Sequence, residues 1–100
     1  MSGRKDTSEV VWDEVKNRLN QKKHRISFEE AATVFMDPLE IAIYDPAHGI
    51  TEHRFISIGQ SLKGRMLVVS YTERAGRIRI ITARQPTRRE RRAYGETSDA

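Results

Sequence analysis

Eight arginines lie between Arg74 and Arg92, and Glu90 is the single acidic residue among them. The planar guanidinium group donates two parallel hydrogen bonds, a geometry that suits phosphate. The first half of this stretch alternates charged residues with isoleucine, as a strand does, and the second half opens like a capped helix. A strand and a helix that both present arginine favour a nucleic-acid partner, and an acidic protein partner is the alternative.

Other side chains provide the groups that RNA cleavage without a metal ion requires. One group takes the proton from the ribose 2′-hydroxyl, another protonates the leaving oxygen, and cations stabilise the pentavalent phosphorane. His24 and Glu52 are candidates for the acid and the base, because both residue types can exchange protons near neutral pH. The candidate cations are Lys23, Arg65, Arg77 and Arg79. Simpler roles stay open, with His24 complementing a helix dipole and Glu52 forming an ion pair.

Metal-binding and disulfide-forming patterns are missing from the sequence. There is no cysteine. The three histidines, His24, His48 and His53, do not have the spacing of a familiar zinc site. We therefore expect no metal site and no other cofactor.

The length of the chain predicts one small domain, and its excess of basic residues lies in the C-terminal quarter of the sequence. The chain has 100 residues, a net charge of +4 and 37% hydrophobic residues, enough for one modest core. Residues 74–100 contain eight Lys or Arg and three Asp or Glu, whereas residues 1–73 contain ten and eleven. The N-terminus lacks the apolar core of a signal peptide, and no apolar run approaches the ~20 residues of a membrane span. We expect a cytoplasmic protein with no membrane partner.

A first helix is predicted over residues 13–23, with Asp13 as its N-cap. Val15 and Leu19 lie four residues apart and form a narrow apolar stripe. The neighbouring polar stripe has the spacing of a solvent-facing surface and consists of Lys16, Asn20 and Lys23.

A capping box predicts the start of a second helix. The box runs from Ser27 to Glu30, and the helix extends over residues 28–36 before Pro38 stops it. Four apolar residues at helical spacing are predicted to enter the core: Phe28, Ala31, Ala32 and Phe35.

A second capping box, from Thr87 to Glu90, predicts a C-terminal helix over residues 88–94. Gly95 is expected to end that helix as a left-handed C-cap. Residues 1–8 and 96–100 are polar and are expected to be disordered.

The middle of the chain predicts four strands. They cover residues 39–44, 54–60, 65–72 and 77–84. Turn-forming residues between them favour an antiparallel meander, and residues 10–12 are either an edge strand or the lead-in to the first helix. The predicted fold class is α+β, with two N-terminal helices, a four-stranded antiparallel sheet and a short C-terminal helix in one domain.

The last strand has two chemically different faces. Ile78 and Ile80 point to one side, and Arg77 and Arg79 point to the other. If the isoleucines meet the helices, the arginines line a sheet face that the helices leave open.

Two runs of residues are specific enough to indicate a family. One is Lys23-His24 followed by Ser27-Phe28-Glu29-Glu30-Ala31, and the other is Arg79-Ile80-Ile81 followed by Ala83-Arg84. Together with flanking matches over residues 10–95, they make the chain resemble the BrnT toxin family of bacterial type II toxin–antitoxin systems.

The resemblance implies a RelE-like fold and a ribonuclease that stops translation, with RNA as its substrate. It also implies a BrnA-like antitoxin as partner, two copies of each protein in the complex, and contact with DNA only through the antitoxin. A non-catalytic RNA-binding module and a domain that only binds the antitoxin are the alternatives.

The matched motifs also suggest roles for individual residues. We expect Arg65, Arg77 and Arg79 to clamp phosphate on the open sheet face, with Lys23 and His24 projecting from the end of the first helix and Glu52 as a second acid or base. The residues expected to contact RNA or antitoxin are Trp12, Arg84, Arg88, Arg89, Arg91 and Arg92.

The sequence departs from the family pattern at two positions. Arg25 stands where the family usually has glycine after Lys-His, and arginine adopts the left-handed conformation of a helix end less readily. Gly95 follows Tyr94 where glutamate is common, which is expected to shorten the last helix.

Overall fold

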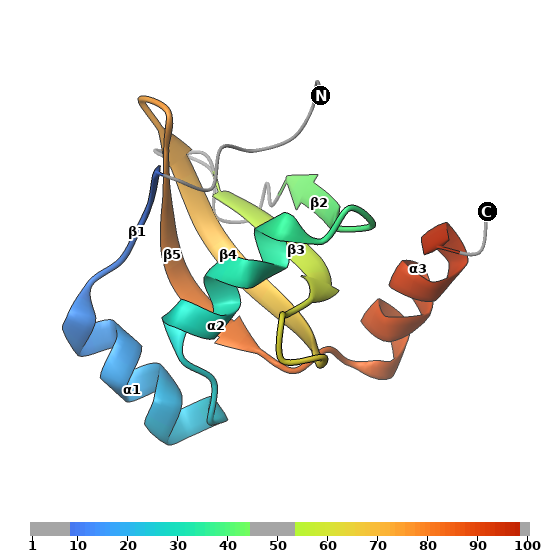
Figure 1. Cartoon of the computed structure of the whole chain (residues 1–100), viewed down its shortest axis with the longest axis horizontal. Helices are drawn as coiled ribbons and strands as arrows, with labels where there is room; N and C mark the ends of the chain where they lie inside the picture. Colours follow the sequence, from blue (N-terminus) through green and yellow to red (C-terminus); the bar gives the residue numbers. More distant parts are fainter. Residues whose placement is uncertain (1–8, 45–53, 99–100) are drawn as a thin grey trace.

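A mixed sheet forms the centre of the molecule (Figure 1). The computed structural model describes residues 9–44 and 54–98, and in these residues the sheet has five strands in the order β1-β5-β4-β3-β2. The strands are β1 (Val10–Val11), β2 (Ile41–Tyr44), β3 (Arg54–Gln60), β4 (Met66–Arg74) and β5 (Arg77–Arg84). The antiparallel meander from β2 to β5 is confirmed. The predicted number of four strands is wrong, because β1 pairs parallel to β5 through Val10 and Ile78 and adds a fifth strand at the edge. Of the two alternatives for residues 10–12, the edge strand is therefore the correct one.

The helix α2 (Phe28–Ala32) lies on one face of this sheet, and α1 (Glu14–His24) lies beside the edge formed by β5. A 3-10 turn, η2 (Thr33–Met36), continues α2 within the segment predicted as one helix. Phe28, Ala31 and Phe35 are buried in the main core as predicted, and Ala32 packs against it partly buried. The sheet contributes alternate residues to the same core: Leu67, Val69, Tyr71, Ile78, Ile80 and Ala83.

The orientation of α1 differs from the expected one. Asn20, predicted to face solvent, is 7% exposed, and Asn17 is fully buried. Val15 and Leu19 instead remain 57% and 59% exposed. The reason is that backbone groups inside the protein require the hydrogen bonds that amide side chains can provide. The polar side of α1 therefore faces the protein.

The side chain of Asn20 forms the hydrogen bonds with β5 that a neighbouring strand would otherwise form. Its amide nitrogen donates to the carbonyl oxygens of Ala83 and Ile26, both at 2.9 Å, and its oxygen accepts from the Ala83 N–H at 3.1 Å. Asn17 accepts from the Phe28 N–H at 2.8 Å and so fixes the first residue of α2. The two asparagines join α1 to both the sheet edge and the second helix.

The C-terminal helix α3 (Arg88–Ser98) runs past Gly95, so the predicted end at residue 94 is wrong. A left-handed C-cap needs a positive φ, and among the described glycines only Gly64 and Gly76 have one. The helix therefore includes residues 96–98, which were expected to be disordered, while residues 1–8, 99 and 100 lie outside the described part. Both halves of the predicted capping box form, with the Thr87 N–H donating to Glu90 and the Glu90 N–H donating to the Thr87 hydroxyl.

Part of the second sheet face is covered by α3. Tyr94 packs against Ile58 and Val68, on the side opposite the main core. Its hydroxyl donates to Asp37 Oδ2 at 2.7 Å. Burial, helped by the Asp37 carboxylate, raises the pKa of Tyr94 to about 12, so this hydroxyl is a poor proton donor for catalysis near neutral pH. The face that the N-terminal helices leave open is thus only half open.

We predict that Asn20→Ala lowers the free energy of unfolding by about 2–4 kcal/mol, because it leaves both backbone groups of Ala83 buried without their partners. Urea unfolding measures this loss. Leu19→Ala is the matched control on the same helix, and its exposed side chain should change the value by less than about 0.5 kcal/mol. Equal effects of the two substitutions would contradict the role given to Asn20.

A second prediction concerns acid stability. Hydrogen bonds from Arg84 and then from Thr87 lower the pKa of Glu90 from 4.5 to about 2. A carboxyl with a depressed folded-state pKa stabilises the fold above its unfolded pKa, and this contribution is lost as the pH falls from 4.5 towards 2. Unfolding curves recorded across this pH window measure the loss. On acidification, the free energy of unfolding should fall by about 1 kcal/mol less in Glu90→Gln than in the parent, a value that allows for solvent screening. If the free energy of unfolding fell equally with pH in both proteins, the Arg84–Glu90 pair would not stabilise the fold.

Candidate nucleic-acid interface

The arginines of β5 lie on the exposed side of the sheet, as the sequence predicts. Ile78 and Ile80 are 2% and 1% exposed in the core, whereas Arg77 and Arg79 are exposed on the opposite face. Arg77 makes one peripheral ion pair, with Glu9 at 3.5 Å, and both partners remain largely in solvent. These two guanidinium groups are therefore accessible to a ligand.

A tight hairpin brings a third arginine to the same place. Ala75 and Gly76 have φ values of 53° and 78°, so both turn residues are left-handed, as in the two-residue turns that suit antiparallel strands. The turn pairs Arg74 with Arg77 across the two strands. Next to this hairpin, the surface has a hollow of about 410 Å³. It is lined by Val11, Thr72, Arg74, Arg77 and Arg79.

A β-bulge in β5 extends the polar row towards the other end of the strand. Tyr71 pairs with Ile80 and Ser70 pairs with Thr82, so Ile81 is an extra residue between them. The extra residue reverses the alternation along β5. Ala83 enters the core after the bulge, while Thr82 shares the exposed side with Arg79.

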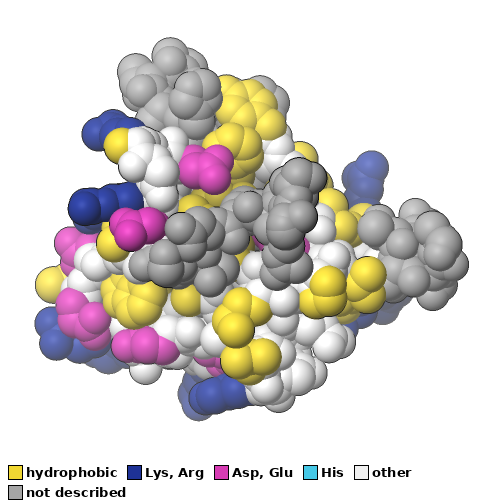
Figure 2. Space-filling model, turned by 45° about the horizontal axis from the view of Figure 1, so that its top comes forward, with side chains coloured by type: hydrophobic (Ala, Val, Ile, Leu, Met, Phe, Trp, Pro, Cys, Tyr) yellow, Lys and Arg dark blue, Asp and Glu magenta, His cyan; other side chains and the backbone are white. Residues whose placement is uncertain are grey.

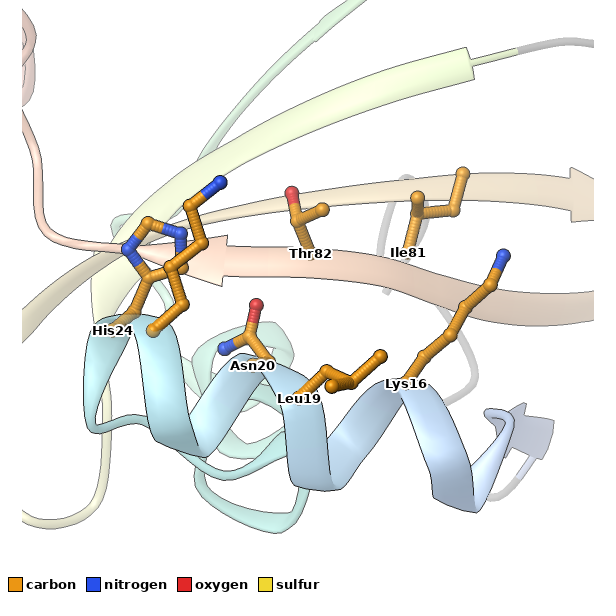
Figure 3. A pocket seen from close by; sticks show the side chains of 7 residues that line it. Lys16, Leu19, Asn20, His24, Ile81 and Thr82 are labelled. Carbon is orange, nitrogen blue, oxygen red and sulfur yellow. The ribbon is translucent and has the colours of Figure 1, made fainter.

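A second hollow lies between α1 and β5 (Figure 3). It measures about 310 Å³ and is lined by Lys16, Leu19, Asn20, Lys23, His24, Ile81 and Thr82. In Figure 3 the side chains of Lys16 and His24 border the opening from α1, and Thr82 borders it from β5. The sequence predicts Lys23 and His24 at this helix end, but it does not show that Lys16 and Thr82 join them.

The two hollows follow one another along β5: the arginine hollow lies over β1, β5 and β4, and the histidine hollow lies between β5 and α1. We call this line of two hollows along β5 the α1–β5 seam. Asp13, the N-cap of α1, shows how Arg79 is placed relative to this helix. Hydrogen bonds from the backbone of Lys16 and Val15 lower the pKa of Asp13, and the charge of Arg79 adds to the effect. Arg79 is therefore close to the N-terminal end of α1, while His24 marks the C-terminal end.

The turn after His24 takes the conformation that the family's glycine would favour. Arg25 has φ 61° and ψ 33°, and its N–H donates to the Gln21 carbonyl. The substitution of arginine for glycine thus keeps the left-handed helix end, at some cost in backbone strain. Its carbonyl oxygen accepts a hydrogen bond from Arg65 at 2.9 Å.

Arg65 does not lie on the open sheet face, so its predicted placement there is wrong. It shares a side with Leu67 by strand alternation, and that side faces the helices. Its guanidinium donates to both carboxylate oxygens of Glu30 at 2.8 Å, and Ser61 donates to the same carboxylate. Arg65 foremost, and Ser61 after it, lower the pKa of the buried Glu30 carboxyl. Arg65 therefore neutralises a buried charge.

The remaining predicted residues are dispersed. Trp12 is partly buried, packs edge-on against Phe28 at 6.3 Å and donates to Glu14, an arrangement typical of a packing residue. Arg84 forms a two-pronged ion pair with Glu90 at 2.9 Å. The α3 arginines are all exposed: Arg88, Arg89, Arg91 and Arg92. Glu52 lies outside the described residues.

Charge is unevenly distributed over the surface. In the view of Figure 2, Lys and Arg side chains lie mostly around the margins, and acidic side chains stand among apolar ones. Among the described residues, no group of three or more His, Asp or Glu side chains is arranged to hold a metal ion. None of the helices in residues 9–44 and 54–98 is long and apolar enough to cross a membrane.

These features define a small α+β protein with an exposed basic surface suited to phosphate. Over residues 12–90 the sequence matches a family model described as the ribonuclease toxin, BrnT, of type II toxin–antitoxin systems. The chain therefore belongs to the BrnT family of ribonuclease toxins, which confirms the family inferred from its sequence motifs.

A solved structure supports the fold. The chain is similar to the crystal structure of the Brucella abortus ribonuclease toxin BrnT, with 20% sequence identity and a TM-score of 0.58. The similarity covers 79% of this chain and 96% of that one. No curated protein matches the sequence.

The different settings of Arg79 and Arg65 lead to opposite predictions. We expect Arg79→Ala to lower the affinity for a single-stranded RNA about tenfold without loss of stability, because it removes an exposed, charge-assisted phosphate contact. Arg65→Met should instead lower the free energy of unfolding by about 2 kcal/mol, since it leaves Glu30 buried and unpaired, and its folded fraction should bind RNA normally.

Fluorescence anisotropy with a labelled oligoribonucleotide, beside urea unfolding of each variant, separates the two effects. A folded Arg65→Met protein that had lost RNA affinity, together with an unaffected Arg79→Ala protein, would reverse the assignment.

Proposed function

We propose that this protein is a metal-independent endoribonuclease toxin that stops translation by cleaving RNA in the cytoplasm. Family membership supports ribonuclease activity in general. The observation that carries the finer proposal is the α1–β5 seam, where the arginine hollow and the histidine hollow occur along one strand. We further propose a BrnA-like antitoxin as its inhibitor, in a complex of two toxins and two antitoxins, with DNA contacted only through the antitoxin. A RelE-like relationship of the fold belongs to the same proposal.

RNA would lie along β5 with its backbone against α1. Lys16 and Lys23 are separated by two helical turns, about 10 Å along the axis. That length spans roughly three nucleotides of a stacked strand at ~3.4 Å each. Arg77 and Arg79 would bind phosphate at one end, and Lys23 and His24 would meet the strand at the other.

Cleavage in this arrangement needs no group beyond the protein's own side chains. The ribose 2′-oxygen attacks the adjacent phosphorus, its proton passes to a base, and the 5′-oxygen leaves with a proton from an acid. His24 would serve as acid or base at the seam, and Glu52 is the second candidate. Lys23 would stabilise the negative charge of the phosphorane beside His24, and Arg77 and Arg79 would hold another phosphate of the same strand.

The proposal gives other roles to three sets of residues that the sequence suggested as RNA contacts. Arg65 supports the fold beneath the seam and is not proposed to touch RNA. Arg84 is held by Glu90 and would act mainly by placing α3. The exposed arginines of α3 stay available for RNA or for antitoxin acids, which would make the two ligands compete.

The test is incubation of the purified protein with total bacterial RNA in the presence of EDTA. The parent should cut the RNA, whereas His24→Ala and Arg79→Ala should cut it at least about 10²-fold and tenfold more slowly, respectively. Lys63→Ala, an exposed cation away from the seam, is the matched control and should behave like the parent.

If the parent leaves free RNA intact, the same variants are tested on translating ribosomes. Cleavage there with the same order of defects keeps the proposal and adds the ribosome as a requirement. Intact RNA in both assays, with salt-sensitive RNA binding, would favour the non-catalytic RNA-binding module instead.

A further inference from the structure

The outer face of α1 carries the helix's apolar side chains. Within residues 14–24, Val15 and Leu19 are the apolar residues, and both are more than half exposed. Surface helices normally turn such residues inward. Here the inward positions belong to Asn17 and Asn20, so the apolar stripe has no place in the core of this chain.

The stripe is bordered by positive charge. A shallow depression of about 370 Å³ is lined by Val15, Arg18, Leu19 and Lys22, which follow the spacing of one helical face. Arg18 and Lys22 are both exposed and lie along one side of the apolar pair. This face therefore combines a small apolar contact with cations at its edge.

We propose that this face, Val15-Arg18-Leu19-Lys22, is the docking site for an acidic amphipathic helix of the antitoxin. The apolar pair would pack against the partner's apolar stripe, and Arg18 and Lys22 would face its carboxylates. A second copy of this chain fits poorly, because the same cations would oppose one another. RNA fits poorly as well, since Val15 and Leu19 offer neither a hydrogen bond nor a charge to a phosphate backbone.

The position of the stripe connects antitoxin binding to inhibition. Leu19 lines both this depression and the hollow that contains Lys16, Lys23 and His24. A helix docked on the stripe would lie beside the opening of the α1–β5 seam and obstruct it. This consequence rests on the proposed function, whereas the docking itself does not.

The experiment measures the affinity of the purified full-length toxin for its cognate antitoxin by calorimetry. The double variant Val15→Asp/Arg18→Glu should bind at least about 30-fold more weakly, since it places two carboxylates where the acidic helix would approach. Both positions are exposed, and an acid in the first turn of α1 suits the helix dipole, so the fold should persist. Circular dichroism and urea unfolding check this point.

The matched control is Leu62→Asp/Lys63→Glu, which makes the same kinds of change on the turn between β3 and β4. Leu62 is 72% exposed and Lys63 is also exposed. This control should alter antitoxin affinity by less than about threefold. RNA cleavage by the free Val15→Asp/Arg18→Glu toxin should match the parent.

Antitoxin affinity of the stripe variant within threefold of the parent would overturn the proposal, as would equal losses in the stripe and control variants. Weaker RNA binding with unchanged antitoxin affinity would also overturn it and assign the stripe to RNA. A parent protein that cuts no RNA, while the stripe variant still loses the antitoxin, would refute the proposed function and leave the docking site standing.

Discussion

The hydrogen bonds of Asn17 and Asn20 hold the arrangement together. A helix that lies against a sheet edge leaves backbone groups of that edge without a strand partner, and buried backbone groups must be satisfied. Asn20 satisfies Ala83 on β5, and Asn17 satisfies Phe28 at the start of α2. Because these bonds fix how α1 is rotated, they also decide that Lys16, Lys23 and His24 line the seam. The same rotation leaves Val15 and Leu19 more than half exposed, with Leu19 at the border of the seam.

Local patterns predicted most of the sheet and the helix starts. The alternation of Ile78 and Ile80 with arginines is a property of adjacent residues, and the Thr87–Glu90 capping box involves one helical turn. Two of the errors arose where distant residues decide the outcome. The burial of Asn20 depends on Ala83, which is 63 positions away, and β1 is a strand because β5 offers an open edge. No short window of sequence contains either partner.

The sequence was a better guide to which residues belong to the candidate site than to how they are arranged. The residues Arg77, Arg79, Lys23 and His24 could be selected from their types and positions, and the structure puts them along one seam. Arg65 could not be separated from them, because its partner Glu30 lies 35 residues earlier in the chain. The bulge at Ile81 was equally invisible, yet it keeps Thr82 on the exposed side of the strand. The number of arginines in the sequence therefore overstates how many are available to bind phosphate. Arg65 and Arg84 are already paired with carboxylates of the protein itself.

The proposed binding of RNA on one side of α1 and of antitoxin on the other agrees with the small size of the protein. A domain of 100 residues has little interior to spare, so an enclosed active site would compete with its core for volume. Under the proposed function, an open seam avoids this conflict because the RNA itself would supply one wall. The same openness leaves the seam easy to obstruct from the neighbouring helix face. A helix attached to the protein through asparagines can present cations to one ligand and an apolar stripe to another, and an antitoxin bound at the stripe could then block RNA without contacting the catalytic groups.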